Sequence, residues 1–107
     1  MDLAQSHCQP CRGDTPPLDD QQIQKWLPQI PQWQLQDGKL ARHCRFKHFK
    51  AAMNFLNRLA ELAEAEGHHP DFCVHYNKVD LVLFTHAIGA LSQNDFILAA
   101  KIDTLLD

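Results

Sequence analysis

Three histidines stand where the chain segments that carry them can meet in one pocket. His68 and His69 follow the expected end of a long helix, and His86 follows the expected end of a strand. A free imidazole has a pKa of ~6.5, so at neutral pH it can either donate or accept a proton. A group of histidines at one end of a sheet therefore predicts proton transfer, that is, general acid and base catalysis.

A predicted hairpin is the element that gathers these side chains. Asn77-Lys78 is typical of a tight turn between a third strand, Phe72 to Tyr76, and a fourth strand, Val79 to Thr85. Pairing of the two strands brings their outer ends together. We therefore expect His69 to lie close to His86, although many residues separate them along the chain.

The other elements follow from apolar periodicity and capping signals. From Leu18 onward the pattern predicts a first helix from Asp19 or Asp20 to about Gln29 and then a strand around Trp33 and Leu35. A hairpin turn at Asp37-Gly38 leads to a strand over 40–46, and a helix over 49–66 follows, ended by Gly67. After the hairpin described above comes a last helix over 93–105, which begins with a Ser92–Asp95 capping box. Hairpins make antiparallel sheets, and amphipathic helices cover one face of a sheet. We predict an α+β fold, a four-stranded antiparallel sheet with three helices packed on one face, in the order α-β-β-α-β-β-α.

Two other interpretations apply to the same residues. Nitrogen and sulfur donors for a metal ion are plentiful, although without a recognised ligand spacing, at His68, His69, Cys73, His75 and His86. Cys73 is expected to be buried in an apolar strand and therefore unreactive as a nucleophile, and Ser92 is expected to cap a helix. In a purely structural interpretation, two histidines and a proline simply end a helix, where positive charge is favoured.

Composition bounds the class of protein. The chain has 107 residues, 45% of them hydrophobic, and a formal charge of −3, which is typical of one soluble domain. The weak acidity argues against a nucleic-acid-binding surface, and no apolar run reaches the ~20 residues that cross a bilayer. We expect a cytoplasmic protein with no nucleic-acid partner and no membrane association.

Residues 1–17 are expected to form a flexible N-terminal tail before a single domain over residues 18–107. This segment is rich in proline and contains little that could form a packed face. It includes a lone CxxC pattern, Cys8-Gln9-Pro10-Cys11, which lacks the second pair of ligands that a zinc site usually needs. We interpret the two cysteines as reduced thiols.

A specific run of motifs surrounds the histidines. An acidic residue, Glu64, stands four positions before His68-His69-Pro70. An aromatic segment, Tyr76-Asn77-Lys78-Val79, follows, then Thr85-His86, and then Asp95 in the next helix. This combination resembles the pterin-4a-carbinolamine dehydratase family, and so do Ile30-Pro31-Gln32-Trp33 and Phe46-Lys47-His48-Phe49. The resemblance covers roughly residues 18–105. The chain departs from some members at Gly67, where they carry an acidic residue, and at Ala87 and Ile88, which make that wall more apolar.

The resemblance implies an activity and a set of site residues. The implied reaction dehydrates 4a-hydroxytetrahydropterin to quinonoid dihydropterin, with no metal or organic cofactor. The implied catalytic residues are His68, His69 and His86, and the candidate substrate-binding residues are Glu64, Pro70, Thr85 and Asp95. For Glu64 an exposed helix carboxylate stays open as an alternative, and for Asp95 a carboxylate favoured by the helix dipole.

Roles and partners complete the expectation. We expect His68 and His86 to act as proton donor and acceptor near C4a, with exchange of the two roles left open, and His69 to position and polarise the pterin. The resemblance implies a homo-oligomer, dimer or tetramer, and a functional link to an aromatic amino acid hydroxylase whose carbinolamine product is recycled. Two alternatives stand beside it: a protein-binding or dimerisation module, and a member that binds pterin without turnover.

Overall fold

The computed structural model describes residues 2–10 and 12–106 and has the predicted order of elements. The helices and strands are α1 (Asp20–Trp26), β1 (Gln34–Gln36), β2 (Lys39–Arg45), α2 (Phe49–Glu66), β3 (Asp71–His75), β4 (Lys78–Leu83) and α3 (Gln93–Leu106), with short 3-10 helices η1 (Leu3–Gln5) and η2 (Leu27–Gln29). The predicted α+β fold is confirmed. Among the described residues, no helix is long and apolar enough to span a membrane.

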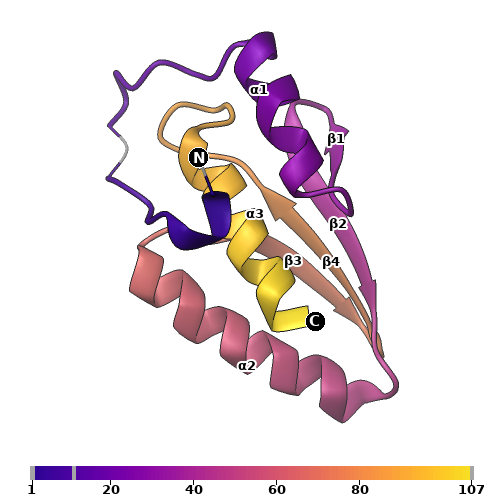
Figure 1. Cartoon of the computed structure of the whole chain (residues 1–107). Helices are drawn as coiled ribbons and strands as arrows, with labels where there is room; N and C mark the ends of the chain where they lie inside the picture. Colours follow the sequence, from indigo (N-terminus) through magenta and orange to yellow (C-terminus); the bar gives the residue numbers. More distant parts are fainter. Residues whose placement is uncertain (1, 11, 107) are drawn as a thin grey trace.

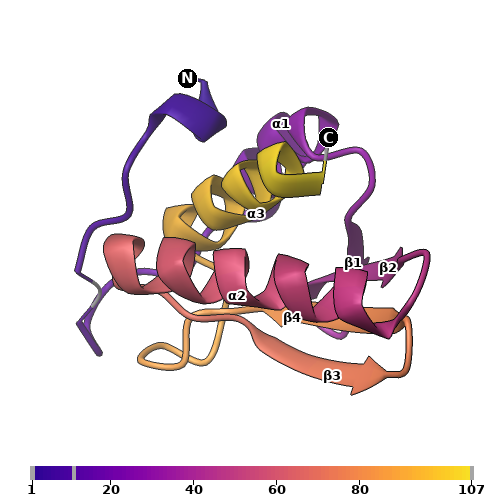
Figure 2. The same cartoon turned by 90° about the horizontal axis from the view of Figure 1, so that it is seen from below.

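The four strands form one antiparallel sheet in the order β1-β2-β4-β3. Val79 of β4 is the register partner of Cys44 in β2 and of Val74 in β3. The three α-helices lie together on one face of the sheet, as Figures 1 and 2 show. The strand β3 therefore stands at an edge, and its outer end leads back to α2 and the paired histidines.

The core lies between β4 and the helices. Alternate residues of β4 and the bridge after it face inward, and the most buried of them, Val79 and Leu83, have no exposed surface. Opposite them, α2 contributes Phe55 and Leu59, which are at most 1% exposed. This alternation is the period-2 pattern that the sequence displays, so burial of the apolar face fixes the register of the hairpin.

Three local signals mark a helix start, a helix end and a turn at the positions predicted from the sequence. Asp19 caps α1 by accepting from the Gln22 backbone N–H, in a capping box. Gly67 ends α2 in the left-handed conformation at φ 66°, which a glycine adopts without a Cβ clash. The Asp37-Gly38 turn has positive φ at both residues, as a two-residue hairpin requires.

Some boundaries differ from the prediction. The first helix ends at Trp26 and continues as η2, because Pro28 cannot donate a helical hydrogen bond. The turn between β3 and β4 is Tyr76-Asn77, with Tyr76 at φ 56°. The expected burial of Cys73 is wrong: its side chain is exposed, because β3 is an edge strand with only its Val74 side partly buried.

The N-terminal segment has a packed face that its composition did not indicate. Leu3 is completely buried in the core cluster, where η1 packs against α3. Figure 1 shows the segment running from η1 past the end of α2 and on toward α1. Mobility of this segment stays a prediction. Of the two CxxC cysteines, Cys8 is a free thiol, and Cys11 lies outside the described residues.

Candidate active site

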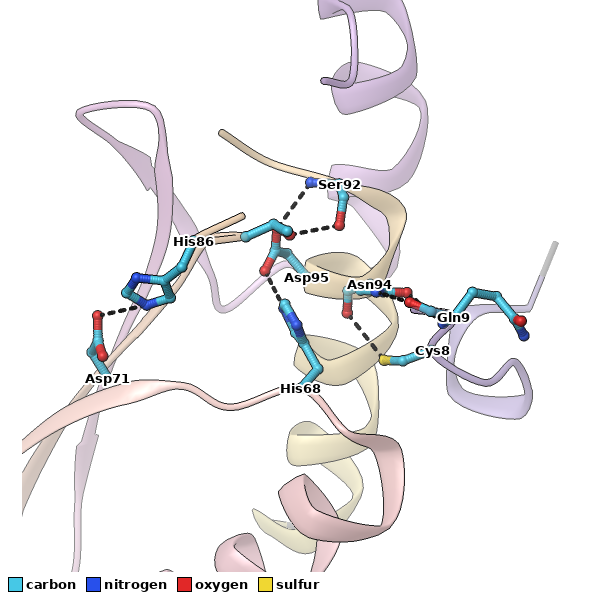
Figure 3. A network of polar contacts seen from close by, with 9 residues as sticks. Cys8, Gln9, His68, Asp71, His86, Ser92, Asn94 and Asp95 are labelled. Carbon is cyan, nitrogen blue, oxygen red and sulfur yellow. Dashed lines mark hydrogen bonds and ion pairs between the residues drawn. The ribbon is translucent and has the colours of Figure 1, made fainter. Parts of the chain in front are cut away.

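His68 is the most enclosed of the three histidines. Gly67 turns the chain at the end of α2 and directs His68 toward the start of α3. There its Nε2 lies 2.6 Å from Oδ1 of Asp95, and the two side chains are 11% and 0% exposed. Figure 3 shows the ring pointing at this carboxylate. A buried pair of this kind holds an imidazole in one orientation.

The Asp95 carboxylate is held in turn by two further groups. Its Oδ2 accepts from the Thr85 hydroxyl at 2.8 Å and from the Ser92 backbone N–H at 2.9 Å. The hydroxyls of Thr85 and Ser92 lie 2.6 Å apart. The contact with the Ser92 N–H is one half of the predicted capping box. Since both oxygens of Asp95 act as acceptors, the Nε2–H of His68 donates, and Nδ1 is the ring nitrogen left to exchange a proton.

The other two histidines pair with carboxylates at the surface. Nε2 of His69 lies 2.5 Å from Oε2 of Glu64, and this pair is exposed. Nε2 of His86 lies 3.6 Å from Oδ2 of Asp71, with both side chains at least 60% exposed. The His86 ring also contacts the Phe84 ring, with centroids 4.1 Å apart. His86 is therefore supported on one side and open on the other.

All three histidines line one hollow of about 220 Å³. It lies between the end of α2, the loop after β4 and the start of α3, and its lining residues are Gln9, Gly67, His68, His69, Thr85, His86, Ala87 and Asn94. The hairpin thus brings His69 and His86 to the same pocket, as predicted from the turn between their strands. The departures noted at Gly67 and Ala87 both fall on the pocket wall.

The remaining predicted residues occupy three different places. Thr85 lines the pocket and is 3% exposed. Asp95 lies behind His68, with no exposed surface of its own. Glu64 and Pro70 line a neighbouring apolar groove between α2 and β3, together with Phe72. Glu64 reaches the histidine pocket through its contact with His69.

Three residues of the site were not predicted from the sequence. Asp71 begins the strand whose outer end was expected to meet His86, so strand pairing could have identified it. Asn94 and Gln9 line the pocket and bond to each other, although they are 85 residues apart. No motif links them, because only the tertiary fold brings them together.

Other polar side chains lie away from this pocket. His75 is exposed on β3. Burial raises the pKa of the Cys8 thiol to about 12, and the negative charge of Glu66 adds to the effect. Within residues 2–10 and 12–106, no three His, Cys, Asp or Glu side chains are grouped so as to hold a metal ion.

Comparison with known proteins decides the family. Residues 16–105 match the family model described as pterin 4 alpha carbinolamine dehydratase. The chain belongs to this family. The resemblance seen in the sequence is thereby confirmed, including its extent along the chain.

Individual pterin carbinolamine dehydratase family members agree with this assignment. A relative from Nitrosomonas eutropha is 46% identical, over 98% of this chain and 94% of its own. One from Rubrobacter xylanophilus is 41% identical, over 97% and 98%. Both carry the name of a pterin-4-alpha-carbinolamine dehydratase, which is a hydro-lyase. A crystal structure of a transcriptional coactivator/pterin dehydratase from Brucella melitensis has a TM-score of 0.81 at 29% identity, and covers 86% of this chain and 100% of that one.

Proposed function

We propose that this protein dehydrates 4a-hydroxytetrahydropterin to quinonoid dihydropterin by general acid and base catalysis. The observation that carries the proposal is the pocket in which three histidines meet, one of them fixed by a buried carboxylate. Family membership supports the substrate class. Several imidazoles around one hollow suit a reaction in which the protein donates one proton to the substrate and removes another from it.

The chemistry requires both proton transfers. The C4a–O bond breaks and the leaving oxygen takes a proton from an acid, so that water departs rather than hydroxide. A base removes the proton from N5, and the N5 electron pair forms the N5–C4a double bond. Acid or base catalysis of this kind typically contributes ~10²–10⁴-fold for each group.

The residues receive roles according to their burial. His68 and His86 exchange the protons near C4a, and the fixed Nδ1 of His68 suits a transfer that needs one geometry. His69, held by Glu64, positions and polarises the pterin ring. Asp95 acts through His68, so it is a positioning residue. Thr85 lines the pocket and also holds Asp95. Glu64 and Pro70 shape the adjoining groove.

The test is the rate of dehydration of chemically generated 4a-hydroxytetrahydropterin, followed by ultraviolet absorbance. We expect wild type to accelerate the reaction over buffer, and His68→Ala and His86→Ala each to lose most of this acceleration. His75→Ala is the matched control, because His75 is an exposed histidine of β3 away from the pocket. A folded wild-type protein that gives no acceleration would contradict the proposal and favour a pterin-binding or protein-binding role.

The proposed physiological setting is the cytoplasm. There the product would return to the cofactor cycle of an aromatic amino acid hydroxylase, which releases the carbinolamine. This link is tested by adding the protein to a hydroxylase assay and measuring whether the carbinolamine still accumulates. Unchanged accumulation would contradict a recycling role while leaving the dehydration chemistry in place.

Self-association is a further part of the proposal. Exposed aromatic residues lie on the edge strand β3 and in the turn after it: Phe72 of β3 is 49% exposed, and Tyr76 of the turn is 67% exposed. The Tyr76 ring stacks on Phe49 of α2. An apolar edge strand is a surface that a second copy of the chain can pair with. Sedimentation velocity should give a dimer or tetramer that Phe72→Glu dissociates. A monomeric wild type would contradict this part.

A further inference from the structure

The N-terminal strap, which we define as residues 2–10, lies outside the residues that match the family model. One end of the strap is fixed in the core. Leu3 is completely buried, and its backbone N–H donates to Oε1 of Gln29 at 3.1 Å. Nζ of Lys101 donates to the carbonyl of Ala4 at 3.2 Å. These contacts hold this end of the strap on η2 and α3.

The other end of the strap joins two elements of the active site. The Cys8 backbone N–H donates to Oε1 of Glu66 at 2.8 Å, at the last residue of α2. The next residue, Gln9, bonds twice to the side chain of Asn94 in α3: its N–H donates to Oδ1 at 2.9 Å, and its carbonyl accepts from Nδ2 at 2.5 Å. The Cys8 thiol also donates to the Asn94 carbonyl at 3.6 Å. Figure 3 shows the contacts of Cys8 and Gln9 with Asn94 beside the His68–Asp95 pair.

The positions of the two anchoring residues give these contacts their meaning. Glu66 stands two residues before His68, and Asn94 stands immediately before Asp95. Two consecutive residues of the strap therefore connect the helix ends that supply the two halves of the His68–Asp95 pair. Gln9 and Asn94 also form part of the pocket wall.

Glu66 is well suited to anchor the strap. Its side chain is only 8% exposed, and its Oε2 lies 3.1 Å from Nδ1 of His7 and 3.8 Å from Nζ of Lys101. Burial by itself raises the pKa of the Glu66 carboxyl, but the Cys8 N–H, His7 and Lys101 outweigh this effect and lower it overall. The carboxylate is therefore an ionised acceptor for the Cys8 N–H at neutral pH.

We propose that the N-terminal strap is a positioning element of the dehydratase pocket, which fixes the distance between His68 and Asp95 by joining Glu66 to Asn94. The proposal rests on the proposed function for its effect on rate. A misplacement of about 1 Å at a reacting group can cost about 100-fold in rate, so a contact outside the pocket can control the proton transfer.

The test uses variants of the full chain that loosen the strap without altering the pocket lining. Glu66→Ala removes the acceptor of the Cys8 N–H, and Leu3→Ala removes the buried anchor at the far end. Glu66→Gln keeps an acceptor oxygen. The controls are Glu61→Ala, an exposed glutamate of the same helix, and Leu35→Ala, an exposed leucine of β1.

Two readouts are measured on each variant below its unfolding temperature. The first is kcat and KM for dehydration, where we expect Glu66→Ala and Leu3→Ala to lower kcat about 10- to 100-fold, with Glu66→Gln close to wild type. The second is the proton NMR signal of the His68 Nε2–H, which a 2.6 Å bond to a carboxylate shifts downfield. We expect this signal to move upfield or broaden when the strap is loosened.

The two readouts separate the failure of this proposal from the failure of the proposed function. If wild type accelerates dehydration and Glu66→Ala and Leu3→Ala match it in kcat, the strap is only structural and the proposal is overturned. If wild type gives no acceleration, the dehydratase function fails, and the His68 signal still decides the matter. An unchanged signal in both strap variants would overturn the proposal in that case also.

Discussion

His68 and His86 face the same pocket and each pairs with a carboxylate, but the two pairs are built in opposite ways. The His68–Asp95 pair is buried, with its nitrogen and oxygen 2.6 Å apart and the carboxylate fully enclosed. The His86–Asp71 pair lies at the surface, with a separation of 3.6 Å between nitrogen and oxygen. The first pair has further hydrogen bonds around it, whereas the second rests on an aromatic ring.

The difference indicates a division of labour. A buried, charge-assisted hydrogen bond fixes the tautomer and orientation of an imidazole. A surface pair at 3.6 Å is screened by water and contributes little to orientation, so His86 can turn toward substrate and exchange protons with solvent. We therefore infer that Asp95 matters through geometry and stability, and Asp71 only through a weak local charge.

The strongest way to test this division is a pair of double-mutant cycles on activity. Asp95→Asn keeps the shape of the side chain, but the amide has only one oxygen acceptor. If the amide nitrogen faces His68, the ring loses the acceptor of its Nε2–H and has to turn. We expect kcat/KM to fall about 100-fold in an otherwise wild-type chain and hardly at all in the His68→Ala background, because the effect passes through His68. Stopped-flow ultraviolet absorbance measures the four rates.

The matching cycle uses Asp71→Asn and His86→Ala. There the coupling should be close to zero, since the two side chains are exposed and weakly paired. Equal coupling in the two cycles would show that burial does not distinguish the pairs. Far-ultraviolet circular dichroism of each variant confirms that the fold is intact.

Stability should separate the two carboxylates next. Asp95→Ala leaves the Thr85 hydroxyl, the Ser92 N–H and the His68 ring without their acceptor. A buried donor left without its acceptor costs about 1–3 kcal/mol of the free energy of unfolding, and here several donors lose theirs. Asp71→Ala should cost no more than about 1 kcal/mol, as for other surface pairs. Urea unfolding at pH 7 measures both, and similar losses for the two variants would contradict the assignment of burial.

The fold could be predicted because its signals are local. Alternation in β4, the Asp37-Gly38 turn, the Gly67 cap and the Ser92–Asp95 capping box each depend on neighbouring residues. The meeting of His69 and His86 followed from the same signals, since one hairpin controls it. These features need no knowledge of which helix packs where.

What could not be predicted depends on contacts between distant segments. Cys73 is exposed because β3 is an edge strand, and strand order is a property of the whole sheet. The packing of Leu3 against α3 and the bonds between Gln9 and Asn94 join opposite ends of the chain. These contacts could not be predicted from a proline-rich composition. They are hydrogen bonds to the backbone of Cys8 and Gln9, which do not depend on the type of side chain.

A smaller effect is expected from Asp71 on catalysis. Asp71→Asn removes a charge beside His86 but keeps a side chain of similar size. An exposed pair is equivalent to ~1 kcal/mol at most, so kcat/KM should fall by no more than about fivefold. The loss should shrink further in 0.5 M salt (on the order of a 4 Å Debye length), because surface charges are screened. A loss as large as that of Asp95→Asn, independent of salt, would assign His86 the same fixed geometry as His68.

The smallest effect concerns Glu66, a buried carboxylate paired with an exposed histidine, His7. The pKa of Glu66 is lowered below its ordinary value of 4.5 in the folded protein, where hydrogen bonds and Lys101 outweigh burial. Its contribution to stability is therefore present above about pH 4.5 and is lost as the pH falls through the lower, folded-state pKa. Glu66→Gln should remove this dependence, so the free energy of unfolding should fall less steeply with acid in the variant than in wild type. Urea titrations at several values between pH 7 and pH 3 measure the slopes, and parallel curves would show that the charge of Glu66 does not hold the strap.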